Sequence, residues 1–342
     1  MRLLSVSSVA AASVVALFSL TQVQAYGTLG HTLTGQLGQK FLTPETARQI
    51  EAILDPSYEG LLSKAAPWPD TIKGFSRYKW ASVLHYVNSP GDNPPDRCVS
   101  TYDFAGLDIV NGLFNMTATM KHFKDQPPTT TGEASILRDA LRFFVHFVGD
   151  IHQPLHDSGK DRGGNDAPIK FGKTKSNLHS MWDTLIITKD IKDRFGNDPK
   201  AYLDDTLSLA GQYWKPESLN WTDCDAANFN VQNPWSNTTN NIKKLCPIEW
   251  ARTMNALDCT YVWKDYSPTR DYSTDYFKQV TGPASQFLVQ KLLAMSGIRM
   301  AAVLNEIYDP ADASSVPEIV KRDESPKLSP RYLRLLEDAL AH

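Results

Sequence analysis

The segment from Glu133 to Ile151 carries apolar side chains on almost every side of a predicted helix. These apolar residues are Leu137, Leu141, Phe143, Phe144, Val145, Phe147, Val148 and Ile151. A helix without a polar face is typical of the interior of a protein, so other elements must surround this one. Pro154 ends the pattern soon after Ile151. The sequence therefore predicts a fold built around a buried helix.

Most other signals along the chain also favour helices. Thr43, Pro44 and Glu45 supply an N-cap, a first-turn proline and an acid suited to the helix dipole, and Asp55-Pro56 predicts the end of that helix. A further helix is expected from Pro283 to Tyr308. Strand signals are few, and residues 163–172 suggest one small hairpin. We therefore expect a mainly α fold: a single helical domain with one small β-hairpin.

Two irregular segments are also predicted. The two prolines of Pro67-Trp68-Pro69-Asp70 are expected to keep that segment in a loop. The stretch from Pro216 to Pro247 is rich in Asn, Trp, Asp and Thr and is expected to form a long loop.

The amino-terminal segment has the pattern of a secretory signal peptide. Arg2 precedes an apolar run from Leu3 to Leu20, and Val23-Gln24-Ala25 places small residues at a cleavage site. A membrane anchor is the alternative, because the run is near the shortest length that spans a bilayer. We expect a signal peptide at residues 1–25, a secreted mature chain that begins at Tyr26, and a main domain at residues 26–308.

The composition changes beyond Tyr308. Residues 309–342 are charged and contain several prolines, which suggests a carboxy-terminal extension. The dibasic pair Lys321-Arg322 in this extension is a candidate processing site.

The net charge and the cysteine content indicate which classes of protein fit this chain. Lys and Arg number 35 against 38 Asp and Glu, a formal charge of -3, which disfavours a broad basic surface for duplex nucleic acid. Four cysteines fit two disulfides in an exported protein, and they permit three pairings. The sequons at Asn115, Asn220 and Asn237 are then candidate glycosylation sites.

The apolar helix contains His146 and Asp150, which lie four residues apart and so share one face. An unpaired carboxylate in such a helix would carry a heavy desolvation cost. A metal ion would supply both charge and coordination. The alternative is a buried hydrogen bond between the imidazole and the carboxylate.

The spacing recurs at His179 and Asp183. His85 lies in another apolar stretch, and Asp70 follows the proline-containing segment described above. His31 lies close to the expected mature terminus. Imidazole and carboxylate ligands without thiolates suit a catalytic zinc site. The sequence contains no H-E-x-x-H motif, so a zincin protease is not supported.

From Tyr26 to Tyr308 the sequence resembles the secreted zinc-dependent, single-strand-specific nucleases of fungi and plants, which are relatives of the bacterial zinc phospholipases C. The motifs that carry the resemblance are Gly30-His31, Trp68-x-Asp70, Leu84-His85-Tyr86, Phe144-Val145-His146-Phe147-Val148-Gly149-Asp150, Gln153-Pro154-Leu155-His156-Asp157, Gly163-Gly164-Asn165 and Asn177-Leu178-His179-x-x-Trp182-Asp183.

This resemblance implies a mostly helical zinc phospholipase C/nuclease-like fold with three zinc ions in one cleft. The implied ligands of the three ions form three sets. They are Asp70, His85, His146 and Asp150 for one zinc; His156, His179 and Asp183 for a second; and His31, Asp150 and Tyr26, through its α-amine and carbonyl oxygen, for a third. The family usually has Trp at the mature terminus, whereas this chain has Tyr26. Only backbone atoms of that residue are needed, so we expect cleavage after Ala25 to be required for activity. His152 is expected to pack away from the ions.

We expect a zinc-activated water to attack phosphorus in line with the departing 3′-oxygen. Asp70 would orient this water as well as bind metal, and Lys73 would support the phosphate charge. The expected substrates are single-stranded DNA, RNA and 3′-nucleotides, and the products of strand cleavage carry a 5′-phosphate. Tyr86 would stack on a base beside the cleaved bond, with core packing as its alternative, and Asn88 would contact a base edge.

The resemblance also implies a disulfide between Cys98 and Cys259, which leaves Cys224 to pair with Cys246. We expect a monomer with no stable protein partner and no membrane contact. Two rival functions remain: a zinc phospholipase C-like phosphodiesterase and a secreted zinc-binding protein without turnover.

Overall fold

The computed structural model of the protein describes residues 27–98, 106–225 and 241–311. Within them the fold is mainly helical, and strands β1 (Pro168–Phe171) and β2 (Thr174–Asn177) form an antiparallel hairpin that turns at Gly172. The predicted fold class is therefore confirmed. The predicted signal peptide and residues 312–342 of the predicted extension lie outside the described residues.

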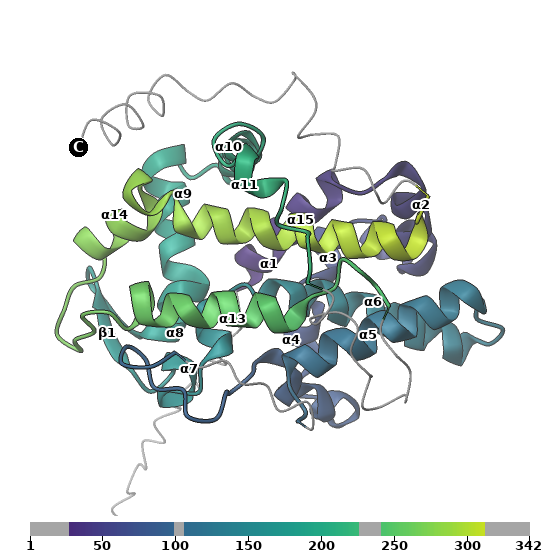
Figure 1. Ribbon diagram of the computed structural model, residues 1–342, viewed down its shortest axis with the longest axis horizontal. Coiled ribbons are helices and arrows are strands. Elements are labelled where there is room, and N and C mark those ends of the chain that lie inside the picture. Colours follow the sequence, from purple (N-terminus) through teal and green to yellow (C-terminus); the bar gives the residue numbers. More distant parts are fainter. Residues whose placement is uncertain (1–26, 99–105, 226–240, 312–342) are drawn as a thin grey trace, which may run out of the picture.

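Helix α6 (Thr131–Asp150) is the predicted apolar helix, and a capping box formed by Thr130 and Glu133 fixes its start. Every residue from 140 to 150 is buried, whereas Ile136 in the first half is exposed. The prediction of a buried helix thus holds for its second half. Figure 1 shows α6 beside α5 (Ile109–Asp125), which packs along it at the end of the view opposite the hairpin.

Helix α15 (Leu288–Tyr308) crosses the molecule and packs against α1 (Thr28–Lys40) and α6 (Figure 1). It begins five residues later than predicted. Pro283–Ser285 form a short 3-10 helix, and Gln286 and Phe287 then take left-handed φ angles of 56° and 57°. Left-handed residues interrupt the helical hydrogen-bond ladder, so the α-helix starts only after them.

Of two predictions for the amino-terminal third of the chain, one is confirmed and one is wrong. Helix α2 (Pro44–Ile53) starts as predicted, because the Thr43 side chain accepts a hydrogen bond from the Thr46 amide. The predicted loop at Trp68–Asp70 is wrong: these residues open the short helix α4 (Trp68–Ile72). Pro69 occupies the first turn, where a helix does not need its amide hydrogen, so the proline permits the helix.

Other short helices complete the fold. Those before the hairpin are η1 (Pro56–Tyr58), α3 (Leu62–Ala65), the 3-10 helix η2 (Ser76–His85), η3 (Pro154–Asp157) and α7 (Asp161–Gly164). Those after it are α8 (Leu178–Ser180), the π-helix η4 (Met181–Leu185), α9 (Ile186–Phe195), α10 (Pro199–Gly211), α11 (Lys215–Ser218), α13 (Pro247–Leu257), the π-helix η5 (Asp258–Val262), α14 (Asp275–Thr281) and η6 (Pro283–Ser285). The predicted loop at residues 216–247 is thus helical at its start, and residues 226–240 lie outside the described part.

The buried apolar side chains form two clusters. One contains residues from α1, from residues 178–187 and from the first half of α15. The other contains residues from α3, α5 and α6 and from the second half of α15. Helix α15 thus joins the two clusters.

Candidate metal centre

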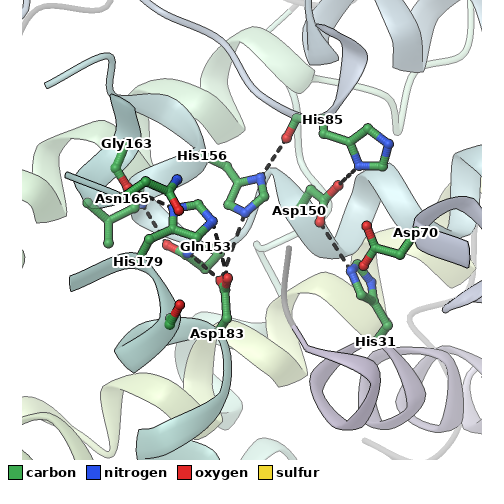
Figure 2. Close-up of polar contacts among 12 residues, drawn as sticks. His31, Asp70, His85, Asp150, Gln153, His156, Gly163, Asn165, His179 and Asp183 are labelled. Atoms are coloured by element: carbon green, nitrogen blue, oxygen red, sulfur yellow. Dashed lines mark hydrogen bonds and ion pairs between the residues drawn. The ribbon is translucent and has the colours of Figure 1, made fainter. Parts of the chain in front are cut away.

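Asp150, the last residue of α6, lies between His31 and His85 in Figure 2, and His146 is a third imidazole within reach of its carboxylate. Its Oδ1 atom lies 3.2 Å from Nε2 of His31, which α1 supplies. Its Oδ2 atom lies 2.9 Å from Nδ1 of His85, at the end of η2, and 3.1 Å from Nε2 of His146, one turn back along α6. All four side chains are buried, so the two oxygens of one carboxylate face imidazoles on both sides.

Asp70 approaches the same group from α4. Its Oδ1 atom lies 3.9 Å from Nε2 of His146 and accepts a hydrogen bond of 3.0 Å from Nζ of Lys73. The Asp70 side chain is buried, whereas the Lys73 side chain is 21% exposed. Lys73 therefore lies between Asp70 and the solvent.

A second group consists of His156, His179 and Asp183, which lie together in Figure 2. His179 and Asp183 flank the junction of α8 and η4, and Nε2 of His179 lies 3.1 Å from Oδ2 of Asp183. His156, in η3, places its Nε2 atom 3.9 Å from Oδ1 of Asp183. The side chain of Gln153 donates a 2.7 Å hydrogen bond to that oxygen. Gln153 appeared in the sequence only as part of a motif, and its contact with Asp183 was not predicted.

Backbone carbonyl groups orient three of the imidazoles. In each case Nδ1 donates a hydrogen bond to a carbonyl oxygen, so Nε2 carries the lone pair that a metal could bind. The pairs are His146 with Ala66 at 2.7 Å, His156 with His85 at 2.6 Å, and His179 with Gly163 at 2.7 Å. Nε2 of His146 also lies 3.0 Å from Nδ1 of His85.

Several buried atoms of these groups fit metal ligation. Nε2 of His85 and of His156 makes no hydrogen bond within the described part of the chain. Oδ1 of Asp150 and Oδ2 of Asp183 make none of good geometry either, although each lies within 3.2 Å of an imidazole nitrogen. Buried polar atoms normally have a hydrogen-bond partner, and a metal ion would serve as one. Three groups offer ligand atoms within 4.8 Å of one another: His31, His146 and Asp150; Asp70, His85 and His146; and His156, His179 and Asp183.

The third of these groups has the same members as the implied ligand set of one zinc. The other two share His146, whereas the resemblance implies that the shared ligand is Asp150. The His146 ring stacks on the His31 ring with 3.7 Å between centroids, which brings it into both groups.

Burial and neighbouring charges set the protonation of the cluster. Burial raises the pKa of Asp150, but His146 and His156 outweigh it and hold this pKa well below its usual range. Burial lowers the pKa of His85 and of His156, although nearby carboxylates oppose the shift. Nearby carboxylates instead outweigh burial at His146 and His179 and raise the pKa of both. A divalent metal binds neutral imidazoles and ionised carboxylates, so its binding would displace protons from these two rings.

Tyr86 and Asn88 follow His85 and are exposed, whereas Val87 between them is buried. The Tyr86 side chain is 40% exposed, so it is not packed in the core. The Asn88 side chain lies beside Gly159, where an added Cβ atom would be 3.2 Å from it. His152 points away from the cluster, as predicted: its Nδ1 donates to Val148 O, and its Nε2 accepts from Arg299.

Tyr26 lies outside the described residues, but Gly27 is placed. Its amide donates a hydrogen bond of 3.1 Å to the carbonyl oxygen of Asp183. The described chain therefore starts beside the second group.

The cysteines form the two disulfides that the sequence favours, Cys98–Cys259 and Cys224–Cys246. Of the sequons, Asn220 is exposed, whereas Asn115 is half-buried within α5 and Asn237 lies outside the described residues. No helix in the described part of the chain is both long and apolar enough to cross a membrane.

The fold and the site together define a class: mainly helical proteins with several metal-binding groups of imidazoles and carboxylates in one buried cluster. The family model described as S1/P1 Nuclease matches residues 26–309. The chain belongs to the S1/P1 nuclease family, and the predicted resemblance and the prediction of a nuclease are confirmed.

Individual relatives align with this chain along most of their own length. Endonuclease 1 of Arabidopsis thaliana is 27% identical over 85% of this chain and 90% of its own. Nuclease P1 of Penicillium citrinum is 29% identical over 83% of this chain and 98% of its own. Nuclease S1 of Aspergillus oryzae is 28% identical over 90% of this chain and 98% of its own.

Proposed function

We propose that the protein is a secreted, zinc-dependent nuclease that hydrolyses single-stranded DNA and RNA to 5′-phosphorylated products and also acts on 3′-nucleotides. The observation that carries this proposal is the arrangement of three metal-binding groups around the carboxylates of Asp150 and Asp183 in a member of the S1/P1 nuclease family.

Three zinc ions would be held by the predicted ligand sets. The residues are Asp70, His85, His146 and Asp150; His156, His179 and Asp183; and His31, Asp150 and the amino terminus of Tyr26. Bound zinc lowers the pKa of a coordinated water and neutralises charge on a phosphate. Three divalent ions exceed the charge of the three carboxylates, so the site would attract a polyanion although the whole chain is acidic.

Asp70 and Lys73 have complementary roles in this proposal. The buried carboxylate of Asp70 can accept a hydrogen bond from the attacking water and so orient it. The ammonium of Lys73, which already donates to Asp70, is partly exposed and can donate to a phosphate oxygen at the same time. No side chain of the protein needs to form a covalent bond with phosphorus.

Tyr86 supports the preference for single strands. Its exposed ring follows His85 directly, and stacking on a base requires that base to be outside a duplex. Asn88 offers both a donor and an acceptor to a base edge. Replacing Tyr86 by Ala should reduce the ratio of kcat/KM for single-stranded over double-stranded DNA; an unchanged ratio would exclude the stacking role.

Secretion is supported by the signal-peptide pattern and by two disulfides, which persist in oxidising compartments. The family match begins at residue 26, directly after the predicted cleavage site. The hydrogen bond from Gly27 to Asp183 places the chain near the cluster at this point.

One assay tests the function against its rivals. The purified protein should release acid-soluble nucleotides from denatured DNA, lose this activity with a chelator and regain it with zinc. Hydrolysis of phosphatidylcholine but not of DNA would favour a phospholipase C. Zinc binding without hydrolysis of either substrate would leave a zinc-binding protein.

A further inference from the structure

The helix η2 (Ser76–His85) leads into the metal centre and has an unusual length for a 3-10 helix. A 3-10 helix has three residues per turn, so side chains three positions apart lie above one another. Ala81 and Leu84 lie on adjoining turns and are buried. This side of η2 anchors the helix to the core.

The next row along the same helix faces the solvent instead. It consists of Arg77, Trp80 and Val83, and Tyr86 continues it just beyond the end of the helix. Trp80 is 49% exposed and Tyr86 is 40% exposed, and Val83 between them is also exposed. We call these four residues the η2 row. Three apolar side chains in succession on one exposed face are unusual for a surface that binds nothing.

The η2 row is continuous with the metal centre. Tyr86 directly follows His85, and the Trp80 ring packs against Phe143 with 5.3 Å between centroids. Phe143 stacks on Phe147 at 5.4 Å, and Phe147 contacts the His85 ring at 5.3 Å. Trp80 therefore packs against the core beneath the site while the residue remains 49% exposed.

The charge along this segment suits a polyanion. Arg77 and Lys79 are exposed, and Lys73 lies beside Asp70 at the metal centre. Residues 73–88 contain no Asp or Glu. Exposed aromatic rings with interspersed cations are the usual means by which proteins bind single-stranded nucleic acid.

We propose that the η2 row is an extended binding surface for the substrate strand, on which Trp80 stacks a base beyond the one taken by Tyr86. A rise of about 2 Å per residue separates Trp80 from Tyr86 by roughly 12 Å along the row, more than one nucleotide step. Arg77, at the far end, then binds a backbone phosphate. This inference rests on the proposed nuclease function and adds a second site of contact that only longer substrates reach.

The test compares substrates of different length. The parent protein and Trp80→Ala are assayed on a dinucleotide and on a long oligothymidylate, and kcat/KM is measured for each. Loss of one base stack should lower the ratio of long-substrate to dinucleotide kcat/KM by roughly 5- to 100-fold, mainly through KM. Trp80→Phe keeps an aromatic ring and should retain most of the ratio. Ile136→Ala, which removes an exposed apolar side chain on α6, should leave it unchanged.

Arg77→Ala provides a second test that leaves the Trp80 ring in place; the Arg77 guanidinium lies 5.2 Å from the centroid of the Tyr78 ring. Arg77→Ala should lower the same ratio and weaken its dependence on salt, because one phosphate contact is lost. An unchanged ratio in both Trp80→Ala and Arg77→Ala would overturn the proposal, as would an equal loss on both substrates, which indicates damage to the metal centre. A parent protein that cleaves neither substrate would instead refute the nuclease function itself.

Discussion

The side chain of Gln153 donates a hydrogen bond to Oδ1 of Asp183, with 2.7 Å between the two atoms. The side-chain amide oxygen of Gln153 accepts a hydrogen bond from the backbone amide of Leu155, so both the nitrogen and the oxygen of this side chain have a partner. Gln153 thereby fixes the carboxylate of Asp183 in the orientation in which its Oδ2 atom faces His179.

Gln153→Met should loosen this carboxylate while keeping the size of the side chain. Loss of such an outer contact typically costs 10- to 100-fold in metal affinity or activity. We expect the zinc concentration that restores half of the activity after chelation to rise by about that factor. Gln49→Met is the control, because Gln49 donates only to Glu45 on α2. Equal zinc dependence of the two variants would contradict the role of Gln153.

Gly149 permits the close approach of α6 to His31. A Cβ atom at this position would lie 2.9 Å from Nδ1 of His31, whose ring is buried and stacked on His146. Gly149→Ala should therefore displace His31 and lower kcat by about a hundredfold, although alanine favours helix formation by about 1 kcal/mol. Gly132→Ala, on the same helix, meets only Thr130 Oγ1 at 3.8 Å and should keep full activity. Full activity in Gly149→Ala would show that His31 is not needed in its present position.

The amino terminus gives a further prediction. Two residues added before Tyr26 would convert its α-amine to an amide and remove one proposed ligand. We expect the zinc content to fall from three ions towards two and activity to drop at least about tenfold. The same two residues added after His342 should change neither quantity. An active protein with the full metal content despite the amino-terminal addition would remove the terminus from the ligand set.

Asp258 is a buried carboxyl group outside the metal centre, and neither of its oxygens has a hydrogen-bond partner among the described residues. Burial, with help from Asp92, raises its pKa well above the usual value. The unfolded chain releases this proton near pH 4, whereas the folded protein keeps it. The free energy of unfolding should therefore fall as pH rises from about 4 to the raised pKa.

Asp258→Asn removes this titration. The variant should unfold with a weaker pH dependence and gain roughly 1–3 kcal/mol at pH 7, because folding no longer requires this side chain to keep a proton that the unfolded chain releases. Urea unfolding between pH 4 and pH 8 measures both effects. Asp125→Asn, which alters an exposed ion pair with Lys121, should change stability by no more than about 0.5 kcal/mol. If Asp258→Asn kept the same pH dependence of the free energy of unfolding as the parent protein, that dependence would belong to another group.

The parts of the site and fold that could be predicted from the sequence depend mostly on residues three or four positions apart in one segment. His146 with Asp150 and His179 with Asp183 are each four residues apart, so helical geometry alone brings them onto one face. The cap at Thr43 likewise depends on neighbours three residues away.

Contacts between distant segments could not be predicted from the sequence in this way. Ala66 orients His146 through its backbone carbonyl, an atom that every residue possesses, so no side chain marks it. The contact of Gln153 with Asp183 joins positions thirty residues apart. The late start of α15 has a similar cause, because Phe287 takes a left-handed conformation while its side chain is buried in the core. The conformational propensity of phenylalanine does not predict a left-handed backbone at this position.

The proposed ligands come from both of the apolar clusters that α15 joins. Within the third proposed set, His31 lies on α1, which packs into the first cluster, whereas Asp150 lies on α6, which packs into the second. Bound zinc would therefore cross-link two separately packed halves of the molecule. Calorimetry of the loaded protein should show one cooperative transition, and after chelation the weaker half should melt first, so that the enzyme loses resistance to heat and to proteolysis together with its activity.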